Sequence, residues 1–597
     1  MIEKMRKYSF VLYHRDYEAF LTELQKLGVL HLIRNTDAKT ESLVQNLELI
    51  GDYAEASTFL KKLASEAEKG ATTLTPKMLL NKITEAREEK ERLTRQAETL
   101  RKQIRELEPW GRFDYELKKK LEANGIKVDF HTCLKNHFKP QWEEEYAISK
   151  ISEVNGILYF VVFHTGEKPV LDADTFSFHK HTIKELEDQL KGVEGRIADI
   201  DEFLQNTAPT AIESFAEEIG RLSQACEYED ATLQGTSEAD DHIRVVGGFI
   251  PIRLEPELKN FLERNGVIHF ATDATVEDNP PVSLRNGWFA RQFEPISKMY
   301  MLPFYDEFDL TPFFAPFFML FFGFCNADIA YGVIFILLAL VLRAKAKNPA
   351  MKSIMMLVVL FGISSIIMGW VMGSALGYDL KKTALDKYII IRNNDQIFNF
   401  ALLLGAIQIL FGTIINGFKQ ARQSGFMYFL APFGTFLFLL GLSVLGAGLL
   451  GADISSTQPY VNYVILAGLV LLMLFNSPGK NPLKNILSGF WALYGVITGF
   501  FGDILSYIRL FALGVSSAIL GFVMNSIGQQ FLSIKIIGPV IFFIFMVVGH
   551  SLNIALSALS GFVHPLRLTF VEFFKNAGFN GPGLEYKPFG KTKKINV

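Results

Sequence analysis

The sequence predicts an α+β N-terminal domain, residues 1–310, followed by an all-α membrane domain, residues 311–597. Charge divides the chain first: residues 311–597 contain 20 Lys and Arg against 8 Asp and Glu, which leaves 40 against 55 in residues 1–310. Apolar runs long enough to cross a bilayer occur only in the second part. Short strand patterns and helix-stop glycines occur in the first part. These observations together indicate an acidic soluble domain joined to a basic membrane domain.

Three segments of the N-terminal domain share one pattern, a helix that stops at a glycine and then a strand. They are centred on Gly28, Gly266 and, more weakly, Gly125. Glycine is favoured just after a helix because it adopts positive φ without strain. Strand patterns at Tyr8–Tyr13 and Ile243–Ile250 precede the first two copies. We therefore expect small β-α-β modules.

Two long helical arms lie between these modules, at about 77–125 and 178–232. Apolar residues recur there every three or four positions between charged ones, and the first arm departs from this spacing only at Lys90. This pattern is typical of a coiled-coil seam. The strand-rich section Lys127–Val170 separates the arms, so we expect them to pair antiparallel.

Neither a metal site nor a nucleotide site is expected, so the chain would not be an enzyme by itself and would need no cofactor. The three cysteines are far apart and have no metal-ligand or disulfide-framework spacing (Cys133, Cys226, Cys325). His31 and His269 fit ordinary strand positions. Gly590-Lys591-Thr592 resembles the end of a phosphate-binding loop, but Glu585 stands where that loop needs its first glycine.

The membrane domain contains seven apolar runs, at Phe313–Leu342, Ile354–Gly377, Ile397–Gly417, Met427–Leu450, Tyr460–Phe475, Ile486–Ile527 and Ile536–Phe574. Asn326–Asp328 interrupts the first run. Basic residues mark four segments between or after the runs: Arg343–Lys352, Lys419 with Arg422, Lys480 with Lys484, and the tail from Lys587. All four face the cytoplasm, as basic segments usually do, if the first run is a hairpin of two short helices. We therefore expect eight transmembrane helices with both termini in the cytoplasm.

The last two apolar runs are unusual in length and in polarity. They span about 42 and 39 residues, although about 20 suffice to cross a bilayer, so we expect long, tilted helices. Each contains an arginine, Arg509 and Arg567, and a charge at mid-membrane depth is costly and usually functional. A polar stripe leads to the second arginine in steps of three and four: His550, Asn553, Ser557, Ser560, His564 and Arg567. A stripe of mostly small residues contains the first: Gly495, Gly499, Gly502, Ser506, Arg509, Leu513 and Ser516.

Such stripes are expected to face protein or water and not lipid. Two segments within them resemble the membrane subunit called subunit a or subunit I of the V-type and A-type rotary ATPases. Ser506–Leu513 is similar to the family's Ser-Tyr-hydrophobic-Arg-Leu-aromatic-Ala-Leu segment. His564–Glu572 is similar to His-Ser-Leu-Arg-Leu followed by Val-Glu, with Pro565 in place of the serine. Proline removes a backbone donor and can kink the helix.

The resemblance implies an ion-translocating stator subunit that forms two ion half-channels against a rotating proteolipid ring, whose subunits are called c or K. It implies that a ring glutamate is the titrating group. The residues expected at the ion-translocation site are Arg509, Arg567, His564, Glu572, Ser506 and Asp503. Those expected to line a half-channel are His550, Asn553, Ser557 and Ser560.

The resemblance further implies partners beyond the ring. These are the peripheral stalk subunits E and G, the central stalk collar subunit, the soluble catalytic sector and the lipid bilayer, with no nucleic acid. The expected location is the plasma membrane of a prokaryote. Two alternatives stay open: a secondary transporter with a large cytoplasmic domain, which would need broken helices in two related halves, and a membrane-anchored scaffold. Arg567 alone could also be a residue that extends to the lipid headgroups.

Overall fold

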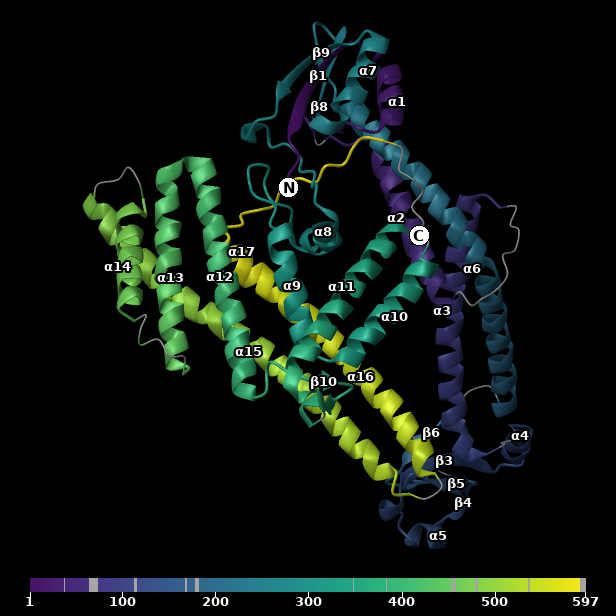
Figure 1. The fold of residues 1–597 in the computed structure, drawn as a ribbon. Coiled ribbons are helices and arrows are strands. Elements are labelled where there is room, and N and C mark those ends of the chain that lie inside the picture. The colour runs from purple at the N-terminus through teal and green to yellow at the C-terminus, as the bar shows by residue number, and fades with distance from the viewer. Residues whose placement is uncertain are drawn as a thin grey trace. The chain divides into compact units, whose positions relative to one another are not determined.

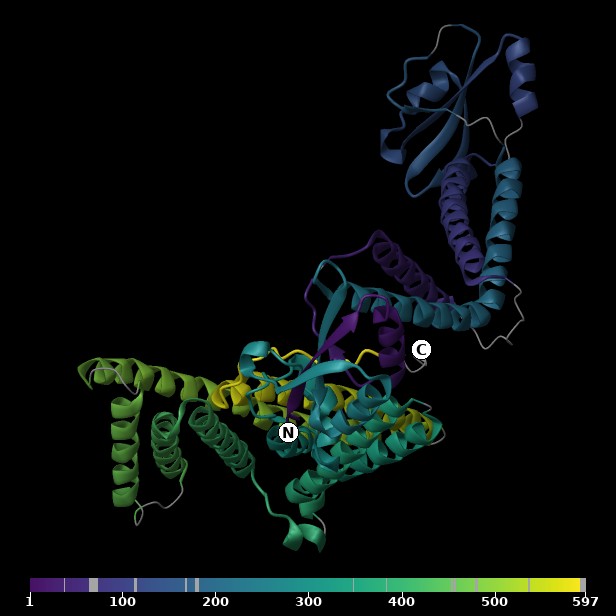
Figure 2. The same ribbon diagram turned by 90° about the horizontal axis from the view of Figure 1, so that it is seen from above.

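The structure is a computed structural model. It describes residues 1–590 except 37, 64–73, 112–114, 167–168, 178–181, 347, 383, 452–454, 456–457, 478–481 and 535–536. The described chain forms two compact units. Unit 1 comprises residues 1–35 and 234–590, and unit 2 comprises residues 36–233 (Figures 1 and 2).

Unit 1 begins with an antiparallel sheet built from both ends of the N-terminal region. Its strands are β1 (Met5–Tyr13), β2 (His31–Leu32), β7 (Thr236–Glu238), β8 (Ile243–Pro251) and β9 (Ile268–Asp273). The order is β2-β8-β1-β9, with β7 paired to β8. Phe10 in the central strand β1 lies opposite Val246 on one side and His269 on the other. The two predicted β-α-β modules therefore interleave and share one sheet.

The helix stops predicted from glycine are confirmed. Helix α1 (Tyr17–Leu27) ends at Gly28, whose φ is 65°, and α7 (Glu255–Asn265) ends at Gly266, whose φ is 61°. In each case the glycine amide donates back to a carbonyl of the last turn. The weaker copy behaves alike, because α4 (Tyr115–Ala123) is followed by Gly125, whose φ is 79°, and then by strand β3 (Lys127–Leu134).

Unit 2 consists of three long helices and a second antiparallel sheet of order β4-β5-β3-β6. The helices are α2 (Glu41–Leu63), α3 (Pro76–Leu107) and α6 (Ile183–Leu233). The strands are β3 (Lys127–Leu134), β4 (Ala147–Val154), β5 (Ile157–His164) and β6 (Asp174–Phe176), and α5 (Gln141–Glu145) precedes β4. This sheet packs around the buried Trp110 and Phe160.

Helices α3 and α6 pack against each other in opposite directions. Leu93, Ala97 and Leu100 of α3 share a buried cluster with Leu186 and Val193 of α6. At the one position where the apolar spacing of α3 fails, Lys90 forms an ion pair with Asp201 of α6. A charge at the seam is thus matched by an opposite charge on the partner helix.

Residues 280–312 join the N-terminal sheet to the first apolar helix and contain helix α8 (Trp288–Tyr300). Its inner face buries Phe293 and Ile296 against the first membrane helices, while Trp288 and Tyr300 remain exposed. The helix includes Pro295 and lies in a stretch with prolines on both sides, which obscured its periodicity.

The C-terminal part of unit 1 is helical, and six of its described helices are long and apolar enough to cross a membrane. The bounds are α9 (Thr311–Cys325), α10 (Ile329–Lys345), α11 (Pro349–Met372), α12 (Asn394–Ser424), α13 (Leu430–Leu449), α14 (Gln458–Phe475), α15 (Pro482–Phe531), α16 (Gly538–Arg567) and α17 (Phe574–Asn576). A π-helical segment, Leu568–Phe573, joins the last two. The six candidates do not include α9 and α10, which are shorter.

Helices α9 and α10 are separate, with the break at Asn326–Asp328 that the sequence indicated. Helix α11 packs on both through small residues: a Cβ on Gly323 would meet Ser364, and Gly332 faces Gly362. Asp328 closes the break. Its carboxylate accepts hydrogen bonds from the Ala330 and Tyr331 amides and from Ser374, Leu376 and Gly377 in the following turn.

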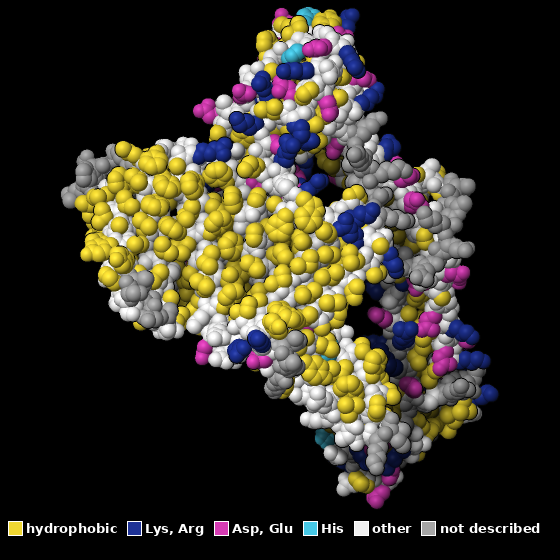
Figure 3. Space-filling view, in the orientation of Figure 1, with side chains coloured by type: hydrophobic (Ala, Val, Ile, Leu, Met, Phe, Trp, Pro, Cys, Tyr) yellow, Lys and Arg dark blue, Asp and Glu magenta, His cyan; other side chains and the backbone are white. Residues whose placement is uncertain are grey.

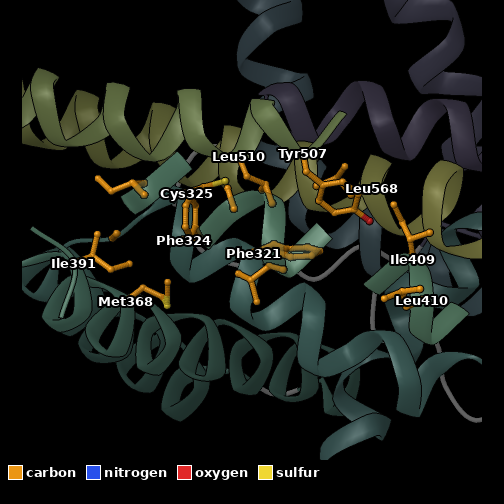
Figure 4. Packing of buried hydrophobic residues seen from close by; sticks show 14 of the residues in the cluster. Phe321, Phe324, Cys325, Met368, Ile391, Ile409, Leu410, Tyr507, Leu510 and Leu568 are labelled. Carbon is orange, nitrogen blue, oxygen red and sulfur yellow. The ribbon is translucent and has the colours of Figure 1, made fainter. Parts of the chain in front are cut away.

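Helices α15 and α16 run antiparallel to each other, and both cross α12, α13 and α14 obliquely (Figure 1). The core beneath α15 contains Phe321, Phe324 and Leu510 together with Tyr507 and Leu568 (Figure 4). The contacts of α15 with α9, α12 and α16 therefore fix the rotation of α15 about its own axis.

After α17 the chain returns to the N-terminal sheet as a tail, residues 578–590. Glu585 forms a parallel bridge with Val282, and the Phe589 amide donates to the Leu30 carbonyl. At the start of the tail, a buried ion pair joins Lys419 of α12 to Glu307, which also accepts from the Asn580 amide at 3.0 Å. The tail thus connects the end of the last helix to both α12 and the sheet.

Candidate functional site

Helices α15 and α16 bring together six residues that the sequence singled out. Asp503, Ser506 and Arg509 lie at successive turns of α15. His564 and Arg567 lie in the last turn of α16, and Glu572 lies in the π-helical segment that follows. Because the helices run antiparallel, the C-terminal end of α16 meets the middle of α15.

The two arginines have different surroundings. The Nη1 atom of Arg509 is buried and has no hydrogen-bond partner among the described residues. The side chain of Arg567 is exposed. Both guanidinium groups are close enough to interact electrostatically with His564. A buried guanidinium donor without a partner is costly, so Arg509 is well suited to receive a carboxylate from another chain.

Glu572 is one of two buried acids of the site, with Asp503. The residue is 2 % exposed, and its Oε2 atom has no hydrogen-bond partner in the described chain. Its neighbours are Ser506, whose hydroxyl donates to the Gly502 carbonyl at 3.1 Å, and the charges of Arg567 and Asp503. The site therefore holds one positive and one negative group, Arg509 and Glu572, each with an unsatisfied buried atom.

Asp503 is already fully engaged by the end of the last helix. Its two oxygens accept from Lys575 Nζ at 2.7 Å and from Asn576 Nδ2 at 2.8 Å. Asn576 Nδ2 also donates to the Glu572 carbonyl at 2.7 Å. These contacts make Asp503 an anchor that holds the segment after Arg567 against α15.

The π-helical segment begins three residues after Pro565. Proline has no amide hydrogen to donate, and its ring disfavours the regular helical bond pattern. The helix continues, but residues 568–573 are wound more loosely, a form that is common at functional sites. The change of winding alters the direction in which Glu572 leaves the helix relative to Arg567.

Four residues of the polar stripe lie nearer the start of α16, and three of them are buried: His550, Asn553 and Ser557. Asn553 Nδ2 donates to the Tyr331 hydroxyl at 2.9 Å, and that hydroxyl lies 2.7 Å from His550 Nδ1. Ser557 and Ser517 hydroxyls lie 2.8 Å apart. Ser560, the fourth, is half-buried. The stripe faces protein, as the cost of exposing it to lipid requires.

These hydrogen bonds also determine which ring nitrogen of a neutral His550 carries the proton. The Tyr331 hydroxyl accepts from Asn553, so its own proton points to His550 Nδ1. The proton of a neutral His550 is then on Nε2, which lies 3.2 Å from Asn525 Oδ1. Asn525 in turn donates to the Leu376 carbonyl at 2.8 Å. This network connects α10, α15, α16 and the turn after α11.

Comparison with known proteins gives consistent relatives. V-type ATP synthase subunit I of Borreliella burgdorferi is 26% identical over the full length of both chains. A-type ATP synthase subunit I is 27% identical in Methanocaldococcus jannaschii, over 70% of this chain and 64% of that protein. It is 28% identical in Archaeoglobus fulgidus, over 59% of each chain. This chain is a homologue of subunit I. With the two archaeal relatives the match covers less than two thirds of their length.

No protein-family model matches the chain. The crystal structure of the cytoplasmic N-terminal domain of subunit I, homolog of subunit a, of V-ATPase aligns with 45% of this subunit I homologue and with all of that chain. The identity is 14% and the TM-score 0.21, which is too low to support an argument about fold.

Several polar residues around the site of this subunit I homologue escaped the sequence analysis. Lys575 and Asn576 follow Glu572 at helical spacing, which was a usable signal, but their partner Asp503 is 72 residues away from Lys575. Tyr331 is 219 residues from His550. Tyr507, fully buried, donates to Gln408 Oε1 at 2.7 Å on α12. Tyr507 belongs to the Ser506–Leu513 segment, but its partner Gln408 is 99 residues away. Nothing local to Tyr331 distinguishes it from an ordinary residue of an apolar helix.

Among the described residues, no group of three or more His, Cys, Asp and Glu side chains forms a candidate metal site. The site in this subunit I homologue consists of fixed charges and hydrogen-bonding side chains. The site places the permanent positive charge of Arg509 beside polar side chains that are partly exposed.

Proposed function

We propose that this chain is the ion-translocating stator subunit of a V/A-type rotary ATPase. The observation that carries the proposal is Arg509, whose buried Nη1 has no partner in the described chain. A guanidinium stays protonated at any physiological pH, so it cannot relay protons by titrating. It can force a carboxylate that passes it to ionise. The carboxylate we assign to this role is the glutamate of a proteolipid ring.

The strength of the attraction limits the mechanism. Two unit charges about 4 Å apart attract by ~4 kcal/mol at an effective dielectric of 20, and by up to ~20 kcal/mol in a dry interior. The higher value would hold the ring in one place. The exposed Arg567 and the half-buried Arg509 favour a hydrated surface, on which the ring glutamate is released again.

Two half-channels would carry the ion to and from that glutamate. The buried chain His550, Asn553 and Ser557 with Tyr331 supports one polar wall, along α16. Ser506, Glu572 and His564 support a second polar region, at the other end of the same helix. Arg509 and Arg567 lie on α15 and α16 beside this second region and would separate the two paths.

The rest of the chain fits a stator. Helices α9 and α10 with the six longer helices would give eight transmembrane helices, with both termini in the cytoplasm. The arms at about 77–125 and 178–232 would form an antiparallel coiled coil that binds peripheral stalk subunits E and G and the central stalk collar. The soluble catalytic sector would supply ATP chemistry, and the location would be the plasma membrane of a prokaryote.

Purification tests the proposal. Affinity isolation of the full chain from mild detergent should recover soluble ATPase subunits and a proteolipid, and the preparation should pump ions when reconstituted with ATP. Isolation of the chain alone, with transport that does not depend on ATP or a proteolipid, would replace the rotary function with that of a self-sufficient transporter.

A further inference from the structure

An open hollow of about 390 Å³ lies where α8, the end of α10 and the start of α11 meet, away from the arginine site. Its walls include Trp288, Arg291, Gln292, Arg343, Lys352 and Ser353. The hollow is held in shape by two hydrogen bonds: Ser353 Oγ donates to Gln292 Oε1 at 3.0 Å, and Gln292 Nε2 donates to the Trp288 carbonyl at 3.1 Å. It is therefore a formed feature of three elements and not the side of a single helix.

Three cations line this hollow, Arg291, Arg343 and Lys352, and all three are exposed. No carboxylate of the described residues lies within 4.0 Å of any of their charged nitrogens. Glu294 interacts with Arg291 from a greater distance and is held by Asn286 at 3.1 Å. Burial raises the pKa of Glu294, and this residue does not line the hollow. The hollow thus has a net positive charge.

The surface next to the hollow is apolar. Leu338, Val341 and Leu342 of α10 and Met351 and Ile354 of α11 are 41–55% exposed. Figure 3 shows Lys and Arg side chains gathered along the edge of a continuous hydrophobic face at this end of the helices. Trp288 is 61% exposed beside the cations. Tryptophan and basic residues at the edge of an apolar helix surface are typical of the headgroup region of a bilayer.

We propose that the hollow binds the phosphate of an anionic phospholipid headgroup, with the acyl chains on the exposed faces of α10 and α11. Arginine and lysine donors suit phosphate oxygens, and arginine can bind them in a bidentate manner. A free phosphate ion would use the same donors but would leave the adjoining apolar surface unused. Basic pockets between membrane helices are a recognised means of binding such headgroups. The site would fix α8, and with it the junction between sheet and helices, to the bilayer.

The test uses the purified complex in nanodiscs or detergent, with native mass spectrometry to count retained lipids. Phosphatidylglycerol should be retained in preference to phosphatidylcholine. The preference should fall about fivefold for each cation removed in R291Q, R343Q and K352Q, since each basic residue near an anionic surface contributes about that factor. The matched control is K345Q, because Lys345 is basic and exposed in the same segment but does not line the hollow. R343K keeps the positive charge and should therefore retain the lipid. It keeps the proposal testable even if a variant that combines R291Q, R343Q and K352Q fails to assemble.

Other outcomes overturn the proposal. Equal retention of the two lipids by the wild-type complex means that the hollow has no headgroup preference. Equal losses in K345Q and in R343Q mean that the attraction is general surface charge. If inorganic phosphate binds to the complex in chloride of matched ionic strength, while neither phospholipid is retained, the ligand is a soluble phosphate and not a lipid.

Discussion

Arg509 and Arg567 carry the same charge but present it differently, because one is half-buried against α15's neighbours and the other is exposed. The buried Nη1 of Arg509 gives that residue the more demanding position. A lysine there would retain the charge but lose the planar fork of donors. Substitution of Arg509 by lysine therefore separates the effect of the positive charge from the effect of the donor geometry.

We expect Arg509→Lys to assemble normally and to lose ATP-driven ion pumping to the uncoupled background. The reason is that a single ammonium cannot place two donors on a passing carboxylate. Pumping is measured by dye quenching in reconstituted vesicles, with ATP hydrolysis and subunit content as assembly controls. Arg422→Lys serves as the matched change outside the site. Wild-type pumping in Arg509→Lys would show that charge alone suffices.

Arg567→Gln should also assemble but pump at about a tenth of the normal rate or less, since hydrogen bonds to charged groups contribute about 1.5–3 kcal/mol. Arg509→Gln should be at least as severe. The same vesicle assay compares them. Near-normal pumping in Arg567→Gln would leave Arg567 a headgroup contact, and the path would then depend on a single arginine.

Among the helices and strands, the features that could be predicted from the sequence are those that depend on residues close together in the chain. Gly28 and Gly266 stop helices through their own φ angles, so both stops were visible locally. The break at Asn326–Asp328 was visible because polar residues interrupt an apolar run. The stripe from His550 to Ser557 was visible through helical spacing, and its burial follows from the cost of lipid exposure.

The remaining features depend on pairings between distant segments, which periodicity does not encode. Asp503 looked like a candidate for the ion path, but Lys575 and Asn576 occupy both its oxygens. Tyr331 looked like an ordinary residue of an apolar helix, but it connects His550 to Asn553. Which polar atoms of the candidate site are satisfied, and which are not, could be learned only from the fold.

The side of the membrane on which the loop between α10 and α11 lies is testable at the same scale. We expect a cysteine at Ala350, an exposed position, to resist an impermeant thiol reagent added to intact cells and to react in inverted vesicles. The basic composition of Arg343–Lys352 is the reason. Ser353 is less suitable because it is half-buried and bonded to Gln292. The background replaces Cys133, Cys226 and Cys325.

A cysteine at Tyr388, which is 63% exposed in the loop before α12, provides the matched control. It should show the opposite pattern and react in intact cells. If the cysteine at Ala350 reacts readily from outside, then α9 and α10 do not form the hairpin that the charge pattern requires.

The buried ion pair of Lys419 and Glu307 gives a stability prediction. Their side chains are 7% and 2% exposed. Removing one partner strands a buried charge, so Glu307→Gln should destabilise the protein by about 3–5 kcal/mol. Replacing both, as in Glu307→Leu with Lys419→Met, should recover much of that loss. Thermal melting followed by size-exclusion fluorescence measures both variants. Equal damage in the single and double variants would mean that a stranded charge is not the source of the loss.

At the scale of the whole unit 1, the tail joins helix and sheet through His31. His31 Nδ1 lies 2.9 Å from the Lys587 carbonyl and 3.0 Å from the Lys587 amide nitrogen, and it can accept from this amide only when Nδ1 carries no proton. Burial lowers the pKa of His31, and the positive charges of Arg34 and Lys587 lower it further, against an opposing backbone hydrogen bond. A lowered folded-state pKa means that the contact stabilises the fold above the ordinary histidine pKa of about 6.5 and weakens as the pH falls below it.

We therefore expect the amides of Lys587 and Phe589 to lose protection as the pH falls below about 6.5, after correction for intrinsic exchange. Hydrogen–deuterium exchange of the tail peptide measures this. His31→Gln keeps an acceptor but does not titrate, so its tail should exchange independently of pH after the same correction. The same pH dependence in both proteins would assign the change to another group.

The tail also has a mechanical consequence. Under the proposed function, a ring turning against α15 and α16 would push them sideways, and a stationary subunit would have to return an equal and opposite force. That load would leave α16 through residues 578–590, where Leu584 and Tyr586 are bonded to Val282, Lys587 to His31 and Phe589 to Leu30. Because the tail lies alongside these residues, a pull along its length would load these bonds together in shear and would not open them one after another. Residues 578–590 would then transmit the sideways force on α16 to the N-terminal sheet.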